Sequence, residues 1–169
     1  MPRARGQDTI RAMRKWIVRA LLALGVLFAL IQLVPYGRDH ESPPVTREVR
    51  WDSERTRDLA VGACYDCHSN LTEWPWYSNV APISWLVEKD VKEGREVLNF
   101  TEWDRPQEGE ADEAAEVVRE GEMPPWQYKP THPAGRLSST EQEELAKGLE
   151  RTLAADAPVA GGEDEGDDE

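Results

Sequence analysis

The sequence contains little cysteine, histidine or methionine and no internal repeat. Its 169 residues include two cysteines, three histidines and three methionines. Two cysteines are too few for the disulfide framework that stabilises many small secreted folds. No segment shows the alternation of apolar and polar residues that marks a half-buried strand, so a sheet-based fold is excluded. The chain has room for one compact helical domain with appendages.

Basic residues are scarce outside the N-terminus. Residues 1–19 hold six of the 20 basic residues and one of the 33 acidic residues. The remaining chain has 14 basic and 32 acidic residues, a net charge of about −18. Such an excess repels phosphate, which excludes nucleic acid as a partner. It suits a protein that stays soluble or meets a basic partner.

One long apolar run is present, over residues 16–34, and only Arg19 and Gln32 are strongly polar within it. As a helix it would extend about 28 Å, close to the roughly 30 Å hydrocarbon core of a bilayer. Basic sequence precedes the run and acidic sequence follows it. The positive-inside rule therefore predicts a cytoplasmic N-terminus over 1–15, a transmembrane signal-anchor helix over 16–35 and the rest outside. A cleaved signal peptide and a soluble core helix are the alternatives, although no small-x-small site follows Val34.

The chain after the apolar run divides into three parts by composition. Residues 36–50, with Pro43-Pro44 and alternating charges, predict an exposed linker. A globular domain is expected over 51–153. Residues 154–169 are small and acidic with almost nothing apolar to bury, so a disordered tail is expected.

Four helices of this domain are predicted from signals at their ends. They run from Ser53 towards Cys64, from Pro82 to Leu98, over 110–120 as far as Gly121, and from a Ser138–Glu141 capping box to about Leu153. The domain is therefore expected to be all-α, with long loops punctuated by proline.

The sequence Cys64-Tyr65-Asp66-Cys67-His68 has the pattern C-x-x-C-H. Two thiols one helical turn apart can add across the two vinyl groups on one edge of a haem, and the adjacent histidine can bind the iron. The pattern predicts one covalently bound haem c with His68 as proximal ligand. A structural zinc site lacks paired further donors, and a thioredoxin-type dithiol lacks its βαβ context. An incidental disulfide is the third alternative.

Met123 is the predicted distal ligand by elimination. Met1 is the initiator and Met13 lies in the basic N-terminal segment. Pro124 and Pro125 follow Met123 and disfavour a helical backbone there, so the thioether should project from an extended loop. His132 is the alternative ligand, and filling a gap in the core is the alternative role for Met123.

Aromatic and basic side chains offer further contacts to a haem. Six of the seven tryptophans lie between positions 51 and 126, where filling the core is their simplest role. A sharper hypothesis places Trp74, Trp76 and Trp126 around the haem, where they would exclude water. Surface solvation is the default for the scarce basic residues of the domain. Those that are candidates to pair with the haem propionates are Arg95, Arg105, Lys129 and Arg136.

The stretch over 64–78, which ends Trp74-Pro75-Trp76-Tyr77-Ser78, resembles a bacterial family of membrane-anchored haem-binding-domain proteins related to cytochromes c. The resemblance covers about 90 residues and continues at 81–86, 94–95, 98–100, 121–125, 132–133 and 136–138. It implies a cytochrome c-like domain on the periplasmic side of a bacterial cytoplasmic membrane. It also implies haem attachment at Cys64 and Cys67 with His68 on the iron, and it favours Met123 opposite.

These expectations converge on a membrane-tethered electron carrier rather than a catalyst. Two axial ligands leave no open iron position for a substrate, and the anchor suits exchange with a membrane or periplasmic redox protein. One alternative is a haem-based gas or redox sensor, in which Met123 leaves the iron. Another is a peroxidase-like enzyme, in which His132 acts as the acid–base group.

Overall fold

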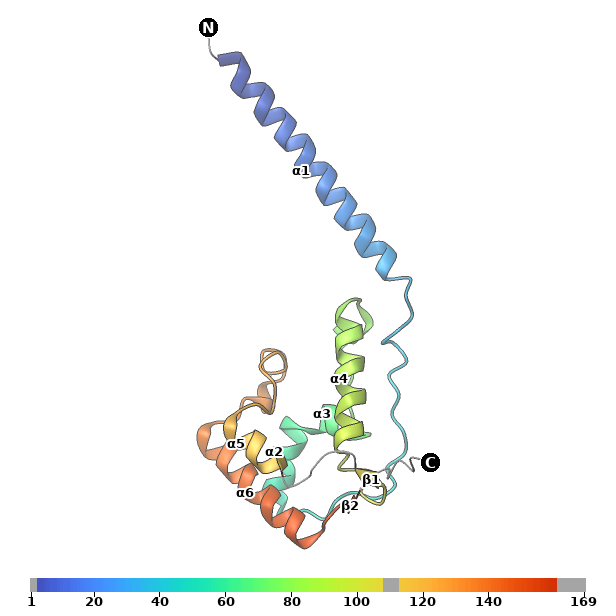
Figure 1. Ribbon diagram of the computed structural model, residues 1–169, viewed down its shortest axis with the longest axis vertical. Helices are drawn as coiled ribbons and strands as arrows, with labels where there is room; N and C mark the ends of the chain where they lie inside the picture. The colour runs from blue at the N-terminus through green and yellow to red at the C-terminus, as the bar shows by residue number, and fades with distance from the viewer. Residues whose placement is uncertain (1–2, 108–112, 161–169) are drawn as a thin grey trace, which may run out of the picture. The chain divides into compact units, whose positions relative to one another are not determined.

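The structure is a computed structural model that describes residues 3–107 and 113–160, and these are mainly helical, as predicted (Figure 1). The chain forms two compact units. The first contains Met1–Asp39 and Trp76–Val87, and the second contains His40–Pro75 and Glu88–Glu169. Helix α4 (Ile83–Val97) contributes residues to both units.

The predicted transmembrane helix is wrong, and with it the expected location as a single-pass protein of the bacterial cytoplasmic membrane. Among the described residues, no helix is both long enough and apolar enough to cross a membrane. Helix α1 (Arg3–Ile31) ends before the apolar run does, so its part from Trp16 onwards extends only about 24 Å. That length falls short of a hydrocarbon core of about 30 Å. Arg14, Lys15 and Arg19 also lie within the last 18 residues of the helix.

Polar contacts of Gln32 mark the end of α1. Its side-chain amide donates to the backbone oxygen of Ala81 at 2.8 Å and accepts from the backbone N–H of Ala81 at 3.0 Å. Arg38 donates to the same amide oxygen at 3.1 Å. The chain thus leaves helix α1 at Gln32, whose side-chain amide bonds to the backbone of Ala81. Ala81 lies just after the short helix η1 (Trp76–Asn79).

The other predicted helices are present, with the end signals read from the sequence. Helix α2 (Glu54–Ala63) is capped by the Ser53 hydroxyl, which accepts from the N–H of Thr56. Helix α5 (Ala114–Glu120) ends at Gly121, whose φ of 80° is the left-handed conformation that glycine adopts readily. Residues 110–112 of the predicted third helix lie outside the described residues. Helix α6 (Ser139–Ala155) opens with the Ser138–Glu141 capping box.

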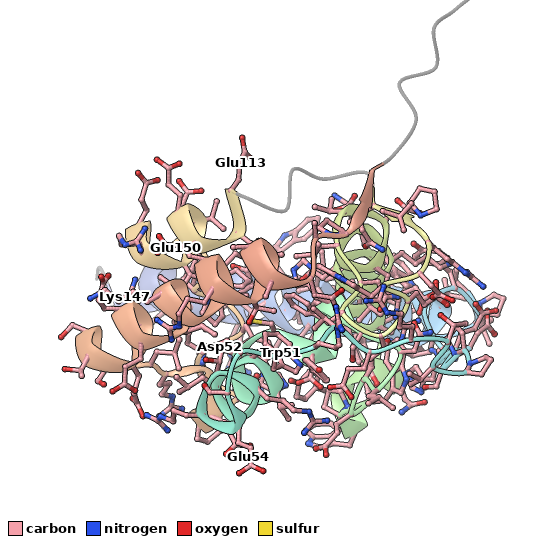
Figure 2. The ribbon with its side chains drawn as sticks, turned by 90° about the horizontal axis from the view of Figure 1, so that it is seen from below. Trp51, Asp52, Glu54, Glu113, Lys147 and Glu150 are labelled. Carbon is pink, nitrogen blue, oxygen red and sulfur yellow. The ribbon has the colours of Figure 1, made fainter. Side chains whose placement is uncertain are left out.

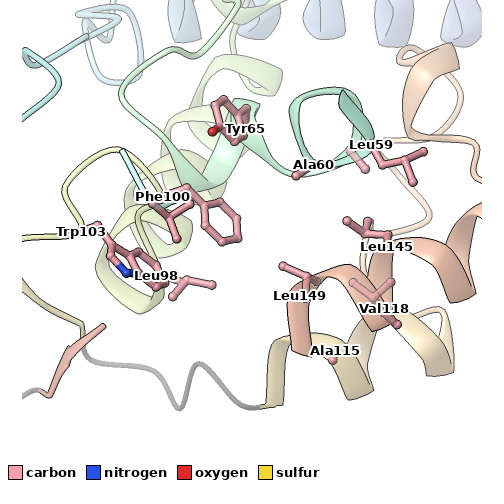
Figure 3. Close-up of a cluster of buried hydrophobic side chains, with 13 residues drawn as sticks. Leu59, Ala60, Tyr65, Leu98, Phe100, Trp103, Ala115, Val118, Leu145 and Leu149 are labelled. Carbon is pink, nitrogen blue, oxygen red and sulfur yellow. The ribbon is translucent and has the colours of Figure 1, made fainter. Parts of the chain in front are cut away.

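The core of the second unit lies where three of these helices and an aromatic loop meet. Leu145 and Leu149 of α6 face Val118 of α5 and Leu59 of α2 (Figure 3). Aromatic side chains from the loop after α4 and from the helix α3 (Tyr65–His68) extend this cluster. The largest of them is Trp103, which is fully buried.

The predicted linker and tail both pair with the loop after α4. Val49 is buried and donates its N–H to the backbone oxygen of Phe100 at 2.9 Å. In the predicted tail, the short strand β2 (Val159–Ala160) pairs in parallel with β1 (Pro106–Gln107), which lies in the loop after α4. Strands of two residues are too short to show alternation, which explains their absence from the sequence prediction. Residues 161–169 of the predicted tail lie outside the described residues.

Asp156, just after α6, bonds to both the predicted linker and the loop after α4. Its buried carboxylate accepts from the backbone N–H of Arg50 at 2.9 Å and from the guanidinium groups of Arg50 and Arg47. Its backbone oxygen accepts from the indole N–H of Trp103 at 3.0 Å. Burial raises the pKa of the Asp156 carboxyl, but these hydrogen bonds outweigh it and hold the pKa below its ordinary value.

The surface of the helices is strongly charged. Glu54 of α2 and Glu113, next to α5, point away from the helices, while Lys147 and Glu150 lie along α6 (Figure 2). Arg119 of α5 pairs with Glu150 at 2.7 Å. Such solvent-exposed pairs each contribute little to stability. The helices are therefore held together mainly by their apolar faces.

Candidate functional site

The C-x-x-C-H motif forms a single helical turn at the end of α2. Cys64 closes α2 by donating its N–H to the backbone oxygen of Ala60 at 2.8 Å. The N–H groups of Cys67 and His68 then bond back to the backbone oxygen of Cys64, at 3.1 and 2.8 Å. This turn places two free thiols one helical turn apart, as the predicted attachment chemistry needs.

The imidazole of His68 is oriented by the loop after α4. Its Nδ1 lies 3.0 Å from the backbone oxygen of Leu98, which can only accept, so Nδ1 carries the proton. The lone pair of Nε2 is then left for another partner. Burial lowers the pKa of His68, and hydrogen bonds to the carbonyls of Leu98 and Gly94 oppose this only in part. The side chain is thus a neutral nitrogen donor with a fixed tautomer.

Gly94 allows α4 to approach the motif. A Cβ atom at this position would lie 2.5 Å from the backbone oxygen of Cys67. Only a residue without a side chain fits such close contact between two backbones. The glycine therefore contributes to the position of Cys67 and, through its own carbonyl, to that of His68.

An apolar cavity of about 210 Å³ lies beside the motif. Cys64, His68 and Met123 all line it. The rest of its wall is mostly apolar and comes from α2, α5, α6 and the end of α4 with the loop after it: Ala63, Val97, Leu98, Phe100, Glu113, Ala114, Val117, Val118 and Leu149. Cys67 lies on the next turn and contacts α4 at Gly94. The structure thus brings together three of the four predicted haem-binding groups at one cavity.

Met123 reaches this cavity from the end of α5. Gly121 turns the chain, and the N–H groups of Glu122 and Met123 both donate to the backbone oxygen of Val117, at 3.0 and 3.1 Å. The Met123 residue is 39 % exposed, so it lies at the rim of the cavity rather than in the core. This placement agrees with the expectation of a projecting thioether and disagrees with a gap-filling role.

His132, the alternative ligand, belongs to a different cluster. Its Nε2 lies 3.6 Å from Oδ2 of Asp66, and its ring stacks on Tyr128 with centroids 3.7 Å apart. The Tyr128 hydroxyl donates to the same carboxylate oxygen at 2.7 Å. His132, Asp66 and Tyr128 line a second pocket. Sequence reasoning missed Asp66 and Tyr128 because their contact joins segments far apart in the chain.

The tryptophans proposed as haem contacts have other surroundings. Trp74 stacks on His40 with centroids 4.5 Å apart. Trp76 belongs to the first unit, and its side chain is largely exposed. Trp126 is also largely exposed, three residues after Met123. Their contacts with a haem stay a prediction.

Three of the four basic candidates for the propionates already bind protein oxygens. Arg95 donates to the backbone oxygens of Ser69 and Glu41 and to the hydroxyl of Thr72. Arg105 pairs with Glu102 at 2.8 Å, and Arg136 donates to backbone oxygens of its own loop. These contacts favour a structural role for each of the three.

The donor set at the cavity fits a haem. Burial raises the pKa of both the Cys64 and the Cys67 thiol to about 12, so each sulfur carries the proton that addition to a vinyl group requires. A neutral imidazole and a thioether face the same apolar space, and these are ligands that cytochromes c present to iron. Within the described part of the chain, no three His, Cys, Asp or Glu side chains gather as they would around a structural zinc ion.

Comparison with known proteins also indicates a haem-binding chain. A family model described as a haem-binding domain matches residues 26–151. The match includes the motif, the cavity walls and Met123. No curated protein and no solved structure matches the chain. Haem is thus the cofactor that the chain binds.

Proposed function

The chain belongs to the haem-binding domain family, and we propose that it holds one haem c covalently and transfers electrons through it. The proposal is carried by one observation: Cys64 and His68, from one helical turn, line the same apolar cavity as Met123, from the loop after α5. Haem supplies a reversible one-electron couple at its iron when bound. The protein residues attach it, ligate it and limit its contact with water.

The two cysteines make the attachment. Each thiol would add across one vinyl group of the haem, with a sulfur–carbon bond at one vinyl carbon and the thiol proton on the other. Atoms and electrons balance without an oxidant or reductant. Because Cys64 and Cys67 are one helical turn apart, their spacing matches two groups on one edge of a flat ring.

His68 and Met123 would supply the protein ligands to the iron. The hydrogen bond from Nδ1 to Leu98 holds the imidazole in the tautomer that can bind iron through Nε2. Met123 offers a soft, neutral thioether from the rim of the cavity. With both side chains bound to the iron, no position would be left for a substrate, which favours electron transfer over catalysis. The apolar wall lowers the local dielectric and so favours the less charged, reduced state of the iron.

Covalent attachment is tested by a haem-stained denaturing gel and a pyridine haemochrome spectrum of the full chain. The wild type should keep its haem on the gel, and Cys64→Ala/Cys67→Ala should lose it to acid–acetone extraction. Glu54→Gln, an exposed change on the same helix that keeps both thiols and lies outside the cavity wall, serves as control and should keep its haem. Haem that extracts fully from the wild type would overturn covalent attachment.

Ligation and electron transfer are tested on the same protein. Met123→Ala should lose the ferric methionine–iron charge-transfer band, while Met13→Ala, in α1, should retain it. Voltammetry of the wild type should show a reversible one-electron wave, and carbon monoxide should not change the reduced spectrum within minutes. Rapid carbon monoxide binding, or no reversible wave, would contradict an electron carrier and favour the ligand-binding alternative.

A further inference from the structure

The loop that carries Met123 is held at two points. Upstream, the left-handed turn at Gly121 and two hydrogen bonds to Val117 fix its start on α5. Downstream, the hydroxyl of Tyr128 donates to Oδ2 of Asp66 at 2.7 Å. Asp66 is the middle of the attachment motif, between the two cysteines. The two ends of the loop are therefore tied to different elements of the same cavity.

Tyr128 is firmly placed to make this contact. Its ring stacks on His132 at an interplanar angle of 2°. On another side, Gly135 packs so closely that a Cβ atom there would lie 2.6 Å from the ring. Burial, with the hydrogen bond to Asp66, raises the pKa of Tyr128, so the hydroxyl keeps its proton and remains a donor.

Asp66 is also fixed from the motif side. Its Oδ1 accepts from the backbone N–H of Glu73 at 3.0 Å, and its backbone oxygen accepts from the hydroxyl of Thr72 at 2.8 Å. The carboxylate thus joins the motif, the segment after it and the Met123 loop. A hydrogen bond to an ionised acceptor is among the stronger ones in proteins.

We propose that Asp66 and Tyr128 are positioning residues that hold the Met123 loop at the cavity and so keep Met123 on the iron. This inference rests on the proposed function, because it takes Met123 as the distal ligand. Without the Asp66–Tyr128 hydrogen bond, the downstream end of the loop loses its hydrogen bond to the motif and keeps only the packing of Tyr128 against His132 and Gly135. The thioether then spends more time away from the iron, and an external ligand competes more easily.

The test uses the haem-bound full chain and imidazole as competing ligand. Tyr128→Phe removes only the hydroxyl and should raise apparent imidazole affinity about tenfold, with a weaker methionine–iron band. Asp66→Asn keeps an acceptor oxygen and should have a smaller effect in the same direction. It serves as the second variant if the first folds poorly.

Tyr65→Phe is the matched control. It removes a hydroxyl from the same motif that also bonds to a carboxylate, that of Glu48, on a segment away from the Met123 loop. It should lower stability yet leave the band and the imidazole affinity unchanged. If Tyr65→Phe and Tyr128→Phe raise the affinity equally, the effect is general loosening and the inference fails.

Failure of the inference is distinguishable from failure of the proposed ligation. If the wild type has no methionine–iron band, and Met123→Ala matches it, then both are wrong. If the wild type has the band and Tyr128→Phe keeps both the band and the wild-type imidazole affinity, then only the positioning role is wrong.

Discussion

Replacing Gly94 with alanine tests how closely α4 must approach the attachment motif. The added Cβ would lie 2.5 Å from the backbone oxygen of Cys67 and 3.0 Å from its carbonyl carbon. Because the neighbour is backbone, the contact is relieved only if one of the two helices moves. Overpacking of this kind costs about 1–3 kcal/mol, and alanine recovers up to about 1 kcal/mol over glycine inside a helix. The contact is severe, so we expect a net loss of about 1–2 kcal/mol.

The assay is guanidinium unfolding of the haem-bound protein, followed by circular dichroism. Gly25→Ala is the matched control, because Gly25 also lies inside a helix and a Cβ there meets no atom within 4 Å. This control should be neutral or stabilising by up to about 1 kcal/mol. If Gly94→Ala were as stable as the wild type, the close approach of α4 to Cys67 would be refuted.

Three further changes test the fold around the site. Asp156→Asn should lower the free energy of unfolding by about 1.5–3 kcal/mol at pH 7. Because the pKa of Asp156 is lowered in the folded state, its contribution to the free energy of unfolding is present above the unfolded pKa of about 4 and is lost as the pH falls through the folded pKa. The free energies of unfolding of variant and wild type, measured in urea, should therefore converge in acid. Leu145→Ala should cost about 2–5 kcal/mol in the same assay, since Leu145 is fully buried, whereas Leu21→Ala, at a position 62 % exposed, should cost under about 0.5 kcal/mol. Ser138→Ala removes half of the capping box and should cost about 1 kcal/mol, measured as a lower Tm.

The features that could be predicted from the sequence depend on neighbouring residues. Ser53, Gly121 and the Ser138–Glu141 pair cap helices through contacts within one turn, so their types and spacing suffice to predict them. The attachment motif is local for the same reason. Met123 was predicted as a ligand by a different route: few methionines were available, and the prolines after it disfavour a helix there.

The features that were missed depend on contacts between distant segments. The apolar run over 16–34 predicts a longer apolar helix than α1 contains, because hydropathy does not reveal that Gln32 pairs with the backbone of Ala81. Likewise, no pattern along the chain indicates that Tyr128 meets Asp66. The hydrogen bonds of Arg95 to the backbone oxygens of Ser69 and Glu41 also join distant segments, while its pairing with a haem propionate stays a prediction.

The cavity and the core share part of their structure, and this decides which substitutions are informative about ligation. The side chains common to both are Ala63, Leu98, Phe100, Val118 and Leu149. Truncating any of them removes core contacts as well as cavity wall, so a loss of haem there does not identify a ligand. A substitution of His68 also affects folding, because its imidazole bonds to the loop after α4. Met123 differs: it is 39 % exposed, and its own backbone N–H bonds to Val117 whatever its side chain. Of the two predicted iron ligands, Met123 is therefore the one whose role can be measured separately from folding.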